Sequence, residues 1–311
     1  MKVRYDFLLP SRMESFMVAC QGMASKKSFE LFEETALGGR AKCASGPLTA
    51  MGLTFLAGAY IALGGFLAVR AGAFFPSDLW GNAGKLAFAS VFPLGLMLVV
   101  VCGADLFTGN CMLLASACSC RRISLVQGVW CGAVSWCGNF VGALFVAWFM
   151  AYATGLIFDT AVVGQAKTMP YAESVVNLAN AKCHLGFAEA FWRGVGCNWL
   201  VCLAVYAALA AEDVMGKIVA LWFPTMAFVA LGMEHCIANM FFIPLGIWTG
   251  TDERYLAYVG SGKSPALTAS WDAFFAGNLL PVTLGNIVGG AVLVSGVYLM
   301  AYRKNLSGRK G

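Results

Sequence analysis

Four ionisable side chains lie within or beside long apolar stretches of this chain. His235 and Glu234 interrupt one stretch, Asp105 interrupts another, and Lys182 precedes a third. An ionisable residue inside a hydrophobic span is by default a candidate for a solute or proton pathway. The alternative for His235 is a neutral imidazole satisfied by Glu234, Asn239 or a backbone carbonyl.

The two acids occupy equivalent positions in an internal repeat. The first copy reads Gly103-Ala-Asp-Leu-Phe-Thr-Gly-Asn110, and the second reads Gly232-Met-Glu-His-Cys-Ile-Ala-Asn239. Glycine, an acid and asparagine in the middle of an apolar run predict a break in the helix, whose freed backbone groups need partners other than lipid. We therefore predict that Asp105, Asn110 and Glu234 brace two broken loops and accept N–H bonds from them.

A second echo, Gly138-Asn-Phe-Val-Gly142 and Gly285-Asn-Ile-Val-Gly289, follows in the next span of each half. Glycines spaced four apart are typical of helices in close contact, and we interpret both pairs as packing surfaces. Three spans per half make the second copy enter the bilayer from the opposite side, which is the inverted-repeat architecture of many transporters. The two breaks then meet near the midplane and point helix N-termini at a shared pathway, which favours an anionic solute.

The composition indicates a membrane protein. Of 311 residues, 59% are hydrophobic and 12% are charged, whereas roughly a quarter are charged in soluble domains. The apolar runs predict an all-α membrane protein whose second and fifth spans are broken. Its six spans are expected near 47–69, 86–118, 124–152, 184–210, 217–248 and 277–302.

These spans divide the chain into a polar N-terminal segment, a transmembrane domain and a short tail. The expected bounds are 1–46, 47–302 and 303–311, with repeats at about 47–152 and 184–302. Fourteen Lys and Arg residues fall on the side of the two termini and six on the other side. The positive-inside rule therefore predicts cytoplasmic termini, and the polar first segment shows no cleavable signal peptide.

Several functions are disfavoured by the composition. Most of the twelve cysteines lie inside apolar runs, where they behave as small hydrophobic residues. The two histidines and the absence of zinc-like spacing, even at Cys118-Ser-Cys120, argue against a metal site, and we expect no cofactor. The net charge of +5 without an aromatic-interleaved basic patch argues against nucleic acid. A membrane enzyme using Cys183, Cys236 and His235 is the alternative from a different class.

The repeat motifs closely resemble those of the formate–nitrite transporter family, and the resemblance extends over all six spans. It includes Lys182-Cys-His184, Asn198 and Asn278-Leu-Leu-Pro-Val-Thr-Leu-Gly-Asn286. The resemblance implies an aquaporin-like protomer, a homopentamer in the plasma membrane with one pore per protomer, and no enzymatic activity. It implies transport of formate, nitrite, lactate or hydrosulfide. The cysteine content and the N-terminal arm favour a eukaryotic, lactate-type branch.

The resemblance also implies roles for individual residues. His235 matches the central pore histidine, and Thr108 matches the loop residue that bonds it or the substrate. Lys182 and Lys42 match an outer and an inner vestibule lysine, and Arg193 has no assigned role. Further pathway residues are Glu234, Asn239, Asn198 and Gly109. The resemblance implies two apolar constrictions: one is formed by Phe92, Val201 and Phe228, and the one nearer the cytoplasm by Leu96, Val99 and Leu106. Phe107 is a further candidate. The spacing of these residues alone favours ordinary helix packing.

Two apolar constrictions make the passage of a bare anion costly. Protonating a carboxylate with a pKa of about 3.5 at pH 7 costs only about 5 kcal/mol. We therefore expect the anion to move with a proton, which arrives from His235 or from water after Lys182 has attracted the anion. The open alternatives are a channel in place of a carrier, and nitrite or hydrosulfide in place of a monocarboxylate.

Overall fold

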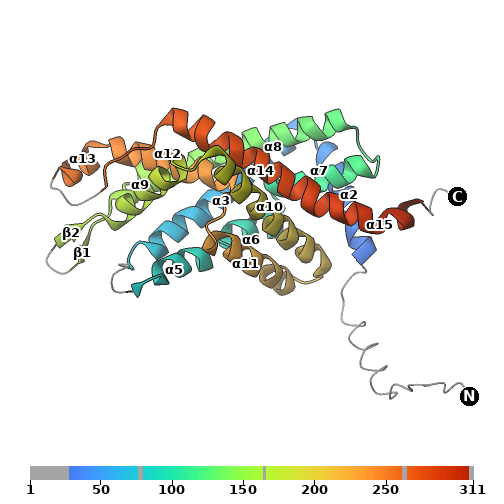
Figure 1. The fold of residues 1–311 in the computed structure, drawn as a ribbon, viewed down its shortest axis with the longest axis horizontal. Helices are drawn as coiled ribbons and strands as arrows, with labels where there is room; N and C mark the ends of the chain where they lie inside the picture. Colours follow the sequence, from blue (N-terminus) through green and yellow to red (C-terminus); the bar gives the residue numbers. More distant parts are fainter. Residues whose placement is uncertain (1–27, 76–79, 164–165, 261–264, 308–311) are drawn as a thin grey trace, which may run out of the picture.

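The computed structural model describes residues 28–75, 80–163, 166–260 and 265–307. These residues form a helical bundle with one short antiparallel hairpin, in which β1 (Ala161–Val163) pairs with β2 (Ala166–Thr168) (Figure 1). The helices of the first half are α2 (Ser28–Cys43), α3 (Pro47–Gly72), α5 (Ala83–Val91), α6 (Leu94–Val101), α7 (Phe107–Ser119), α8 (Leu125–Val146), η1 (Ala147–Ala153) and η2 (Leu156–Phe158).

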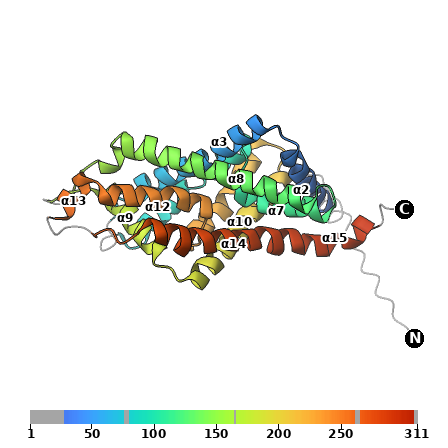
Figure 2. The ribbon, with the colours of Figure 1, turned by 90° about the horizontal axis from the view of Figure 1, so that it is seen from above.

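The second half begins after the hairpin and ends in a long C-terminal helix. Its helices are α9 (Pro170–Cys183), α10 (Phe187–Ala210), α11 (Val214–Ala230), α12 (Cys236–Thr251), α13 (Glu253–Val259), η3 (Ala273–Leu279), α14 (Leu280–Val288), η4 (Gly289–Gly296) and α15 (Val297–Ser307). Seen from above, α12 lies between α8 and α14 (Figure 2). The segments η3 to α15 run as one helix with two π-helical stretches.

The predicted membrane fold is confirmed, with breaks in the second and fifth spans. Within the described ranges, five helices are long and apolar enough to cross a membrane: Pro47–Gly72, Ala83–Val101, Leu125–Ala153, Phe187–Ala210 and Ala273–Arg303. The fifth predicted span is divided into the shorter apolar helices α11 and α12, and α7 continues the second span after its break. Each break contains one glycine with a positive φ, Gly103 (75°) in the first and Gly232 (71°) in the second. Residues with a side chain adopt this left-handed conformation only under strain.

The structure adds one helix to the start of each predicted repeat. Helix α2 packs on α7, where a Cβ on Gly39 would lie 2.2 Å from the carbonyl oxygen of Leu113. Helix α9 packs on α12 in the equivalent way, and a Cβ on Gly246 would lie 2.4 Å from the Cβ of Ala179. In the structure, a helix thus precedes residue 47 in the first half and residue 184 in the second.

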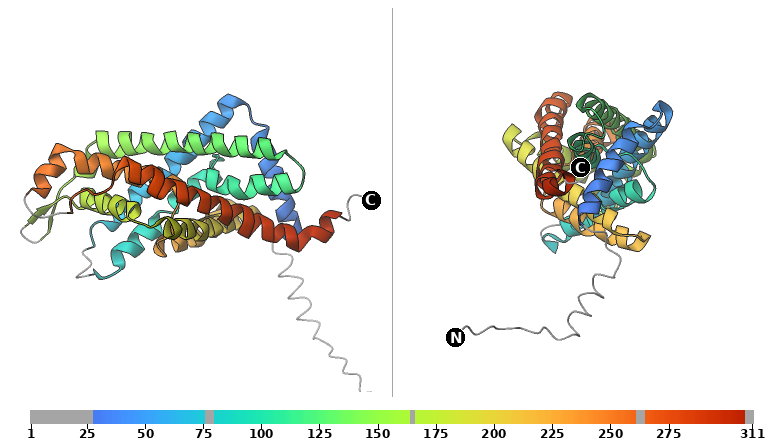
Figure 3. Two further views of the ribbon diagram at one scale, coloured as in Figure 1. Left: turned by 45° about the horizontal axis from the view of Figure 1, so that its top comes forward. Right: turned by 90° about the vertical axis from the view of Figure 1, so that its right-hand side faces the viewer.

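Helices α2 and α15 lie at one end of the molecule, and the hairpin and α13 lie at the other (Figure 3). Aromatic rings hold the first end together, since Tyr302 lies 5.7 Å from Phe29 and 6.0 Å from Tyr298 between ring centroids. At the hairpin end, hydrogen bonds from the Arg254 guanidinium hold the pKa of the Asp252 carboxyl well below its usual range.

The glycines of the second echo form close helix contacts. A Cβ on Gly142 of α8 would lie 2.0 Å from the carbonyl oxygen of Phe55 in α3. In the second half, a Cβ on Gly289 would lie 2.4 Å from the carbonyl oxygen of Val195 in α10. The two contacts are equivalent in the repeat, because α8 packs on α3 as α14 and η4 pack on α10.

We expect Gly142→Val and Gly289→Val to lower the thermal midpoint and the yield of folded protein, because each added side chain forces two helix backbones apart. Thermal unfolding in detergent, with size-exclusion chromatography, measures both. Gly52→Val in α3 is the matched control, since a Cβ there meets nothing within 4 Å. A Gly142→Val protein as stable as the control would contradict the prediction.

Candidate functional site

Two asparagines that we interpreted only as part of a packing motif brace the breaks. In the first half, the side-chain oxygen of Asn139 accepts the backbone N–H of Phe107 at 2.8 Å. Its amide nitrogen donates to the carbonyl oxygens of Thr54 at 2.7 Å and Asp105 at 2.9 Å. One fully buried carboxamide thus satisfies both the free N–H at the start of α7 and a free carbonyl in the break.

Asn286 repeats this pattern in the second half. It accepts the backbone N–H of Cys236 at 2.9 Å and donates to the carbonyl oxygens of Gly194 at 2.8 Å and Glu234 at 3.0 Å. The signal for this role was present in the sequence, since Asn139 and Asn286 occupy equivalent places beside the paired glycines.

On the α2 side of the breaks, a lysine, an acid and an asparagine form one network. Lys42 Nζ lies 3.1 Å from Asp105 Oδ1, and the same oxygen accepts a hydrogen bond from Asn110 Nδ2 at 2.6 Å. Asn110 also donates to the hydroxyl of Ser135 at 3.1 Å. The sequence did not indicate Ser135, which has no counterpart in the motif that we recognised.

An equivalent network lies on the α9 side. Lys182 Nζ lies 2.7 Å from Glu234 Oε1, and Glu234 Oε2 accepts hydrogen bonds from Asn239 at 2.6 Å and Asn278 at 3.2 Å. Only 13% of the lysine side chain and 4% of the Glu234 side chain are exposed, so this ion pair is buried. Asn278, which we named only as part of a motif, also donates to the carbonyl of Lys182 at 3.0 Å.

The two acids therefore brace the breaks differently from our expectation. Their carboxylates accept hydrogen bonds from asparagine side chains and pair with lysines. Their backbone N–H groups donate to α3 and α10, from Asp105 to the Leu53 carbonyl at 3.0 Å and from Glu234 to the Arg193 carbonyl at 3.3 Å. The Arg193 side chain donates to the carbonyl of Gly232 at 3.3 Å and pairs with Glu189 at 2.5 Å.

His235 lies between the two networks as the N-cap of α12. Its Nδ1 accepts the backbone N–H of Ala238 at 3.1 Å, and its Nε2 lies 3.1 Å from the Thr108 hydroxyl. Because Nδ1 is an acceptor, the imidazole is neutral in this state and carries its proton on Nε2, which faces Thr108. The structure thus brings together two residues from different halves of the chain.

Two aromatic rings pack beside His235. The Phe228 ring stacks on the imidazole with centroids 5.9 Å apart, and Phe92 meets Phe228 edge-on at 5.9 Å. Both phenylalanines and Val201 are buried in the same core cluster. These three residues are the ones that the resemblance implies as one constriction, and two of them, Phe92 and Phe228, are in ring contact.

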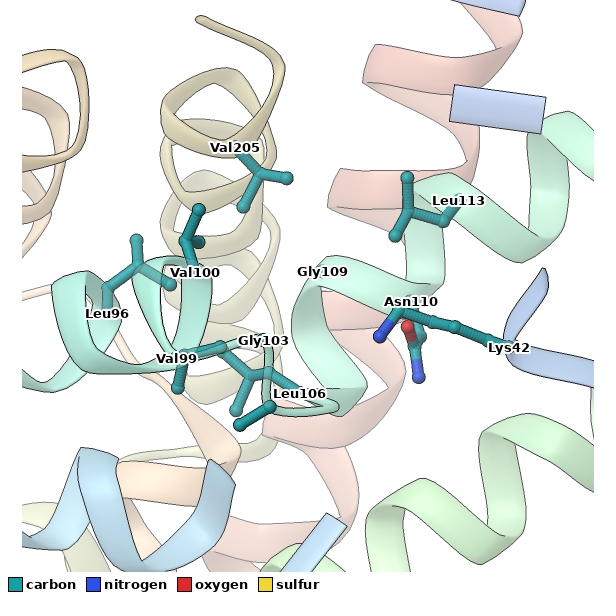
Figure 4. Close-up of a pocket in the computed structure, with 11 residues that line it drawn as sticks. Lys42, Leu96, Val99, Val100, Gly103, Leu106, Gly109, Asn110, Leu113 and Val205 are labelled. Atoms are coloured by element: carbon teal, nitrogen blue, oxygen red, sulfur yellow. The ribbon is translucent and has the colours of Figure 1, made fainter. Parts of the chain in front are cut away.

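On the α2 side, a cavity of about 200 Å³ opens next to Lys42. Figure 4 shows Lys42 reaching toward Asn110 while apolar side chains from α6 face the two residues. The predicted residues that line this cavity are Lys42, Leu96, Val99, Leu106, Gly109 and Asn110. Val100, Gly103, Ala104, Leu113 and Val205 complete the lining.

Phe107, Asn198 and His184 are among the residues singled out from the sequence that do not line this cavity. Phe107 does not line it and begins α7 instead. Asn198 donates to the carbonyl oxygens of Thr108 at 3.0 Å and Asn286 at 2.6 Å. It therefore holds the backbone beside the His235–Thr108 pair, which we call the waist. His184 is exposed at the end of α9, with Nδ1 2.6 Å from the carbonyl of Asn180. Over the part of the chain that the structure describes, no three His, Cys, Asp or Glu side chains cluster as metal ligands would.

Comparisons with known proteins agree with this geometry. Residues 29–300 match the formate/nitrite transporter family. The "Probable formate transporter" of Methanothermobacter thermautotrophicus is 46% identical over 260 residues, which are 81% of this chain and 88% of that protein. The "Formate channel BtFdhC" of Bacillus thuringiensis is 36% identical over 262 residues, covering 83% of this chain and 88% of the channel.

The fold also agrees with a solved structure. A "Pentameric formate channel with formate bound" superposes with a TM-score of 0.70 and 31% identity, covering 82% of this chain and 97% of the channel. All three proteins are transporters or channels, so the alternative of a membrane thiol or metal enzyme is excluded. The chain therefore belongs to the formate/nitrite transporter family and is an integral membrane transport protein.

Proposed function

We propose that this protein carries formate and similar small weak-acid anions across a membrane together with a proton. The supporting observation is the neutral His235–Thr108 pair, with apolar side chains on both sides of it and one lysine–acid network on each side. Formate is favoured as the substrate because the similar proteins described above are named for formate.

The two lysines attract an anion to either side of the waist. Each lysine keeps an acid partner, so the anion approaches a polar but nearly neutral site and no isolated charge is buried. Beyond the lysine, the anion meets apolar side chains, where its charged form is penalised. Protonation then becomes the less costly route, and the neutral acid crosses the waist.

We assign the supply of the proton to water and the orientation of the acid to His235. A neutral imidazole whose Nδ1 accepts the Ala238 N–H has only the Nε2 proton to give, and giving it would leave an anionic ring in an apolar waist. The Nε2–H group serves instead as a hydrogen-bond donor to the passing substrate or to Thr108.

The proposal includes the assembly and its setting. We infer a homopentamer by similarity to the pentameric channel, with one pathway in each protomer. The excess of Lys and Arg beside the termini favours cytoplasmic termini, with the α2 side of the waist facing the cytoplasm and the α9 side facing out. A plasma-membrane location agrees with this orientation. Lipid covers the remaining apolar surface.

Nitrite is the second candidate substrate. Nitrite and formate are both bent anions with two terminal oxygens, and a waist that offers one imidazole and one hydroxyl contacts either in the same way. Lactate, which the cysteine content favoured, and hydrosulfide are further candidates.

Proteoliposomes test the proposal. The purified protein is reconstituted, and the uptake of labelled formate, lactate and nitrite is measured under imposed pH gradients. We expect formate uptake to rise with an inward proton gradient and to acidify the lumen. Formate flux without a response to the gradient would support a channel for the bare anion, and the absence of formate flux would overturn the substrate assignment.

A further inference from the structure

The two constrictions share one equivalent position of the repeat, Val99 in the first half and Phe228 in the second. In the first break the N–H of Ala104 donates to the Val99 carbonyl at 2.8 Å, and in the second the N–H of Met233 donates to the Phe228 carbonyl at 3.0 Å. These bonds align Val99 with Phe228, and the motifs align Leu106 with His235. The same alignment of the two halves places Leu96, the third residue of the α2-side constriction, opposite Thr225.

On the α9 side, Thr225 therefore has the repeat position that Leu96 has in the α2-side constriction. It lies in α11 three residues before Phe228, so the two side chains lie on one face of the helix. Its partner in the repeat, Leu96, lines the cavity beside Val99. Of the three aligned positions, His235 belongs to the waist, Phe228 stacks on His235, and Thr225 is the third.

No described residue hydrogen-bonds the Thr225 hydroxyl. The side chain is fully buried, yet its oxygen has no hydrogen-bond partner among the described residues. A threonine inside a helix commonly donates to the carbonyl four residues earlier, and this one does not. A buried hydroxyl without a partner destabilises a protein. Because Thr225 also aligns with a constriction position, which Thr249 does not, its oxygen is placed to bond a group that comes and goes.

We propose that the Thr225 hydroxyl hydrogen-bonds the substrate in the α9-side constriction and favours oxyacids over solutes that hydrogen-bond weakly. This inference rests on the proposed transport of weak acids. A hydroxyl both donates and accepts, so it satisfies either oxygen of an uncharged carboxylic acid, whereas sulfur is a weak donor and a weak acceptor. Thr225 thus adds a contact for the substrate one helical turn from Phe228.

Three variants in proteoliposomes test this inference. Thr225→Val keeps the shape and removes the hydroxyl, Thr225→Ser keeps the hydroxyl, and Thr249→Val is the matched control. Thr249 is likewise buried in a helix without a described hydroxyl partner, but it lies near the far end of α12. We expect Thr225→Val to raise the KM for formate about three- to tenfold relative to the KM for hydrosulfide, as expected for the loss of one neutral hydrogen bond. Thr225→Ser should retain the wild-type ratio, and so should Thr249→Val.

An unchanged KM ratio in Thr225→Val, or an equal change in Thr249→Val or Thr225→Ser, would overturn the inference. Thermal unfolding and size-exclusion chromatography show whether each variant is folded. A purely packing role would change the thermal midpoint without changing the ratio. Failure of the proposed function is distinguishable from failure of this inference, because the wild-type protein itself would then carry no formate in the same assay.

Discussion

Lys182→Met is expected to destabilise the protein and to abolish most formate uptake. The substitution leaves the Glu234 carboxylate, whose side chain is 4% exposed, without its cation. Removing one partner of a buried ion pair costs about 3–5 kcal/mol, since the remaining charge stays desolvated. Thermal unfolding in detergent measures the loss of stability, and proteoliposome flux measures the loss of uptake.

Two further variants sharpen this test. Lys182→Met combined with Glu234→Gln removes both charges, so stability should largely recover while uptake stays low for want of the attracting cation. Lys42→Met breaks the equivalent pair on the other side, where the lysine is 24% exposed, and should destabilise the protein less. A single Lys182→Met protein as stable as the double variant would show that the pair does not hold the second break.

His235→Leu should reduce formate uptake at least about tenfold, because it leaves two buried polar groups without partners. The leucine cannot cap α12 through the Ala238 N–H, and it cannot bond the Thr108 hydroxyl. The same substitution makes the second break like the first, where Leu106 occupies this position. Initial rates of uptake over a range of pH gradients measure the effect.

His235→Asn separates the two roles of the histidine. Asparagine is a good N-cap residue, so the variant should fold and keep a polar waist. If water supplies the proton, its uptake of formate remains linked to the pH gradient. A folded Asn variant that carries formate without responding to the gradient would identify His235 as the proton donor.

The sequence predicted the membrane fold and both breaks because those features are local. Six apolar runs and a repeated glycine–acid–asparagine pattern identify spans and interruptions without knowledge of tertiary contacts. The ends of the predicted spans differ by a few residues from the ends of the observed helices, and the apolar runs did not predict helices α2 and α9. Both helices are too polar for the hydropathy signal of a span and are held by packing on α7 and α12.

The partners of the candidate site could not be read from the sequence in the same way. Lys42 and Asp105, or Asn286 and Cys236, are far apart in the chain and meet only after folding. Asn139 carried a signal in its repeat position, but we interpreted that motif through its glycines alone. Thr225 carried only its repeat alignment with Leu96 as a signal, since a lone threonine in an apolar helix is an ordinary packing residue until its hydroxyl is found without a partner among the described residues.

Leu106 and His235 differ at one repeat position, so the free-energy profile of a solute along the proposed pathway is asymmetric. In the proposed pathway, a solute entering from the α2 side passes the aliphatic Leu96, Val99 and Leu106 before it reaches a ring nitrogen, whereas one entering from the α9 side meets Phe228, whose ring already stacks on the imidazole. Half-saturation concentrations should consequently differ between the two faces. Microscopic reversibility still requires equal ratios of maximal rate to half-saturation in both directions at zero gradient, so the asymmetry sets speed from each face and never the direction of net movement.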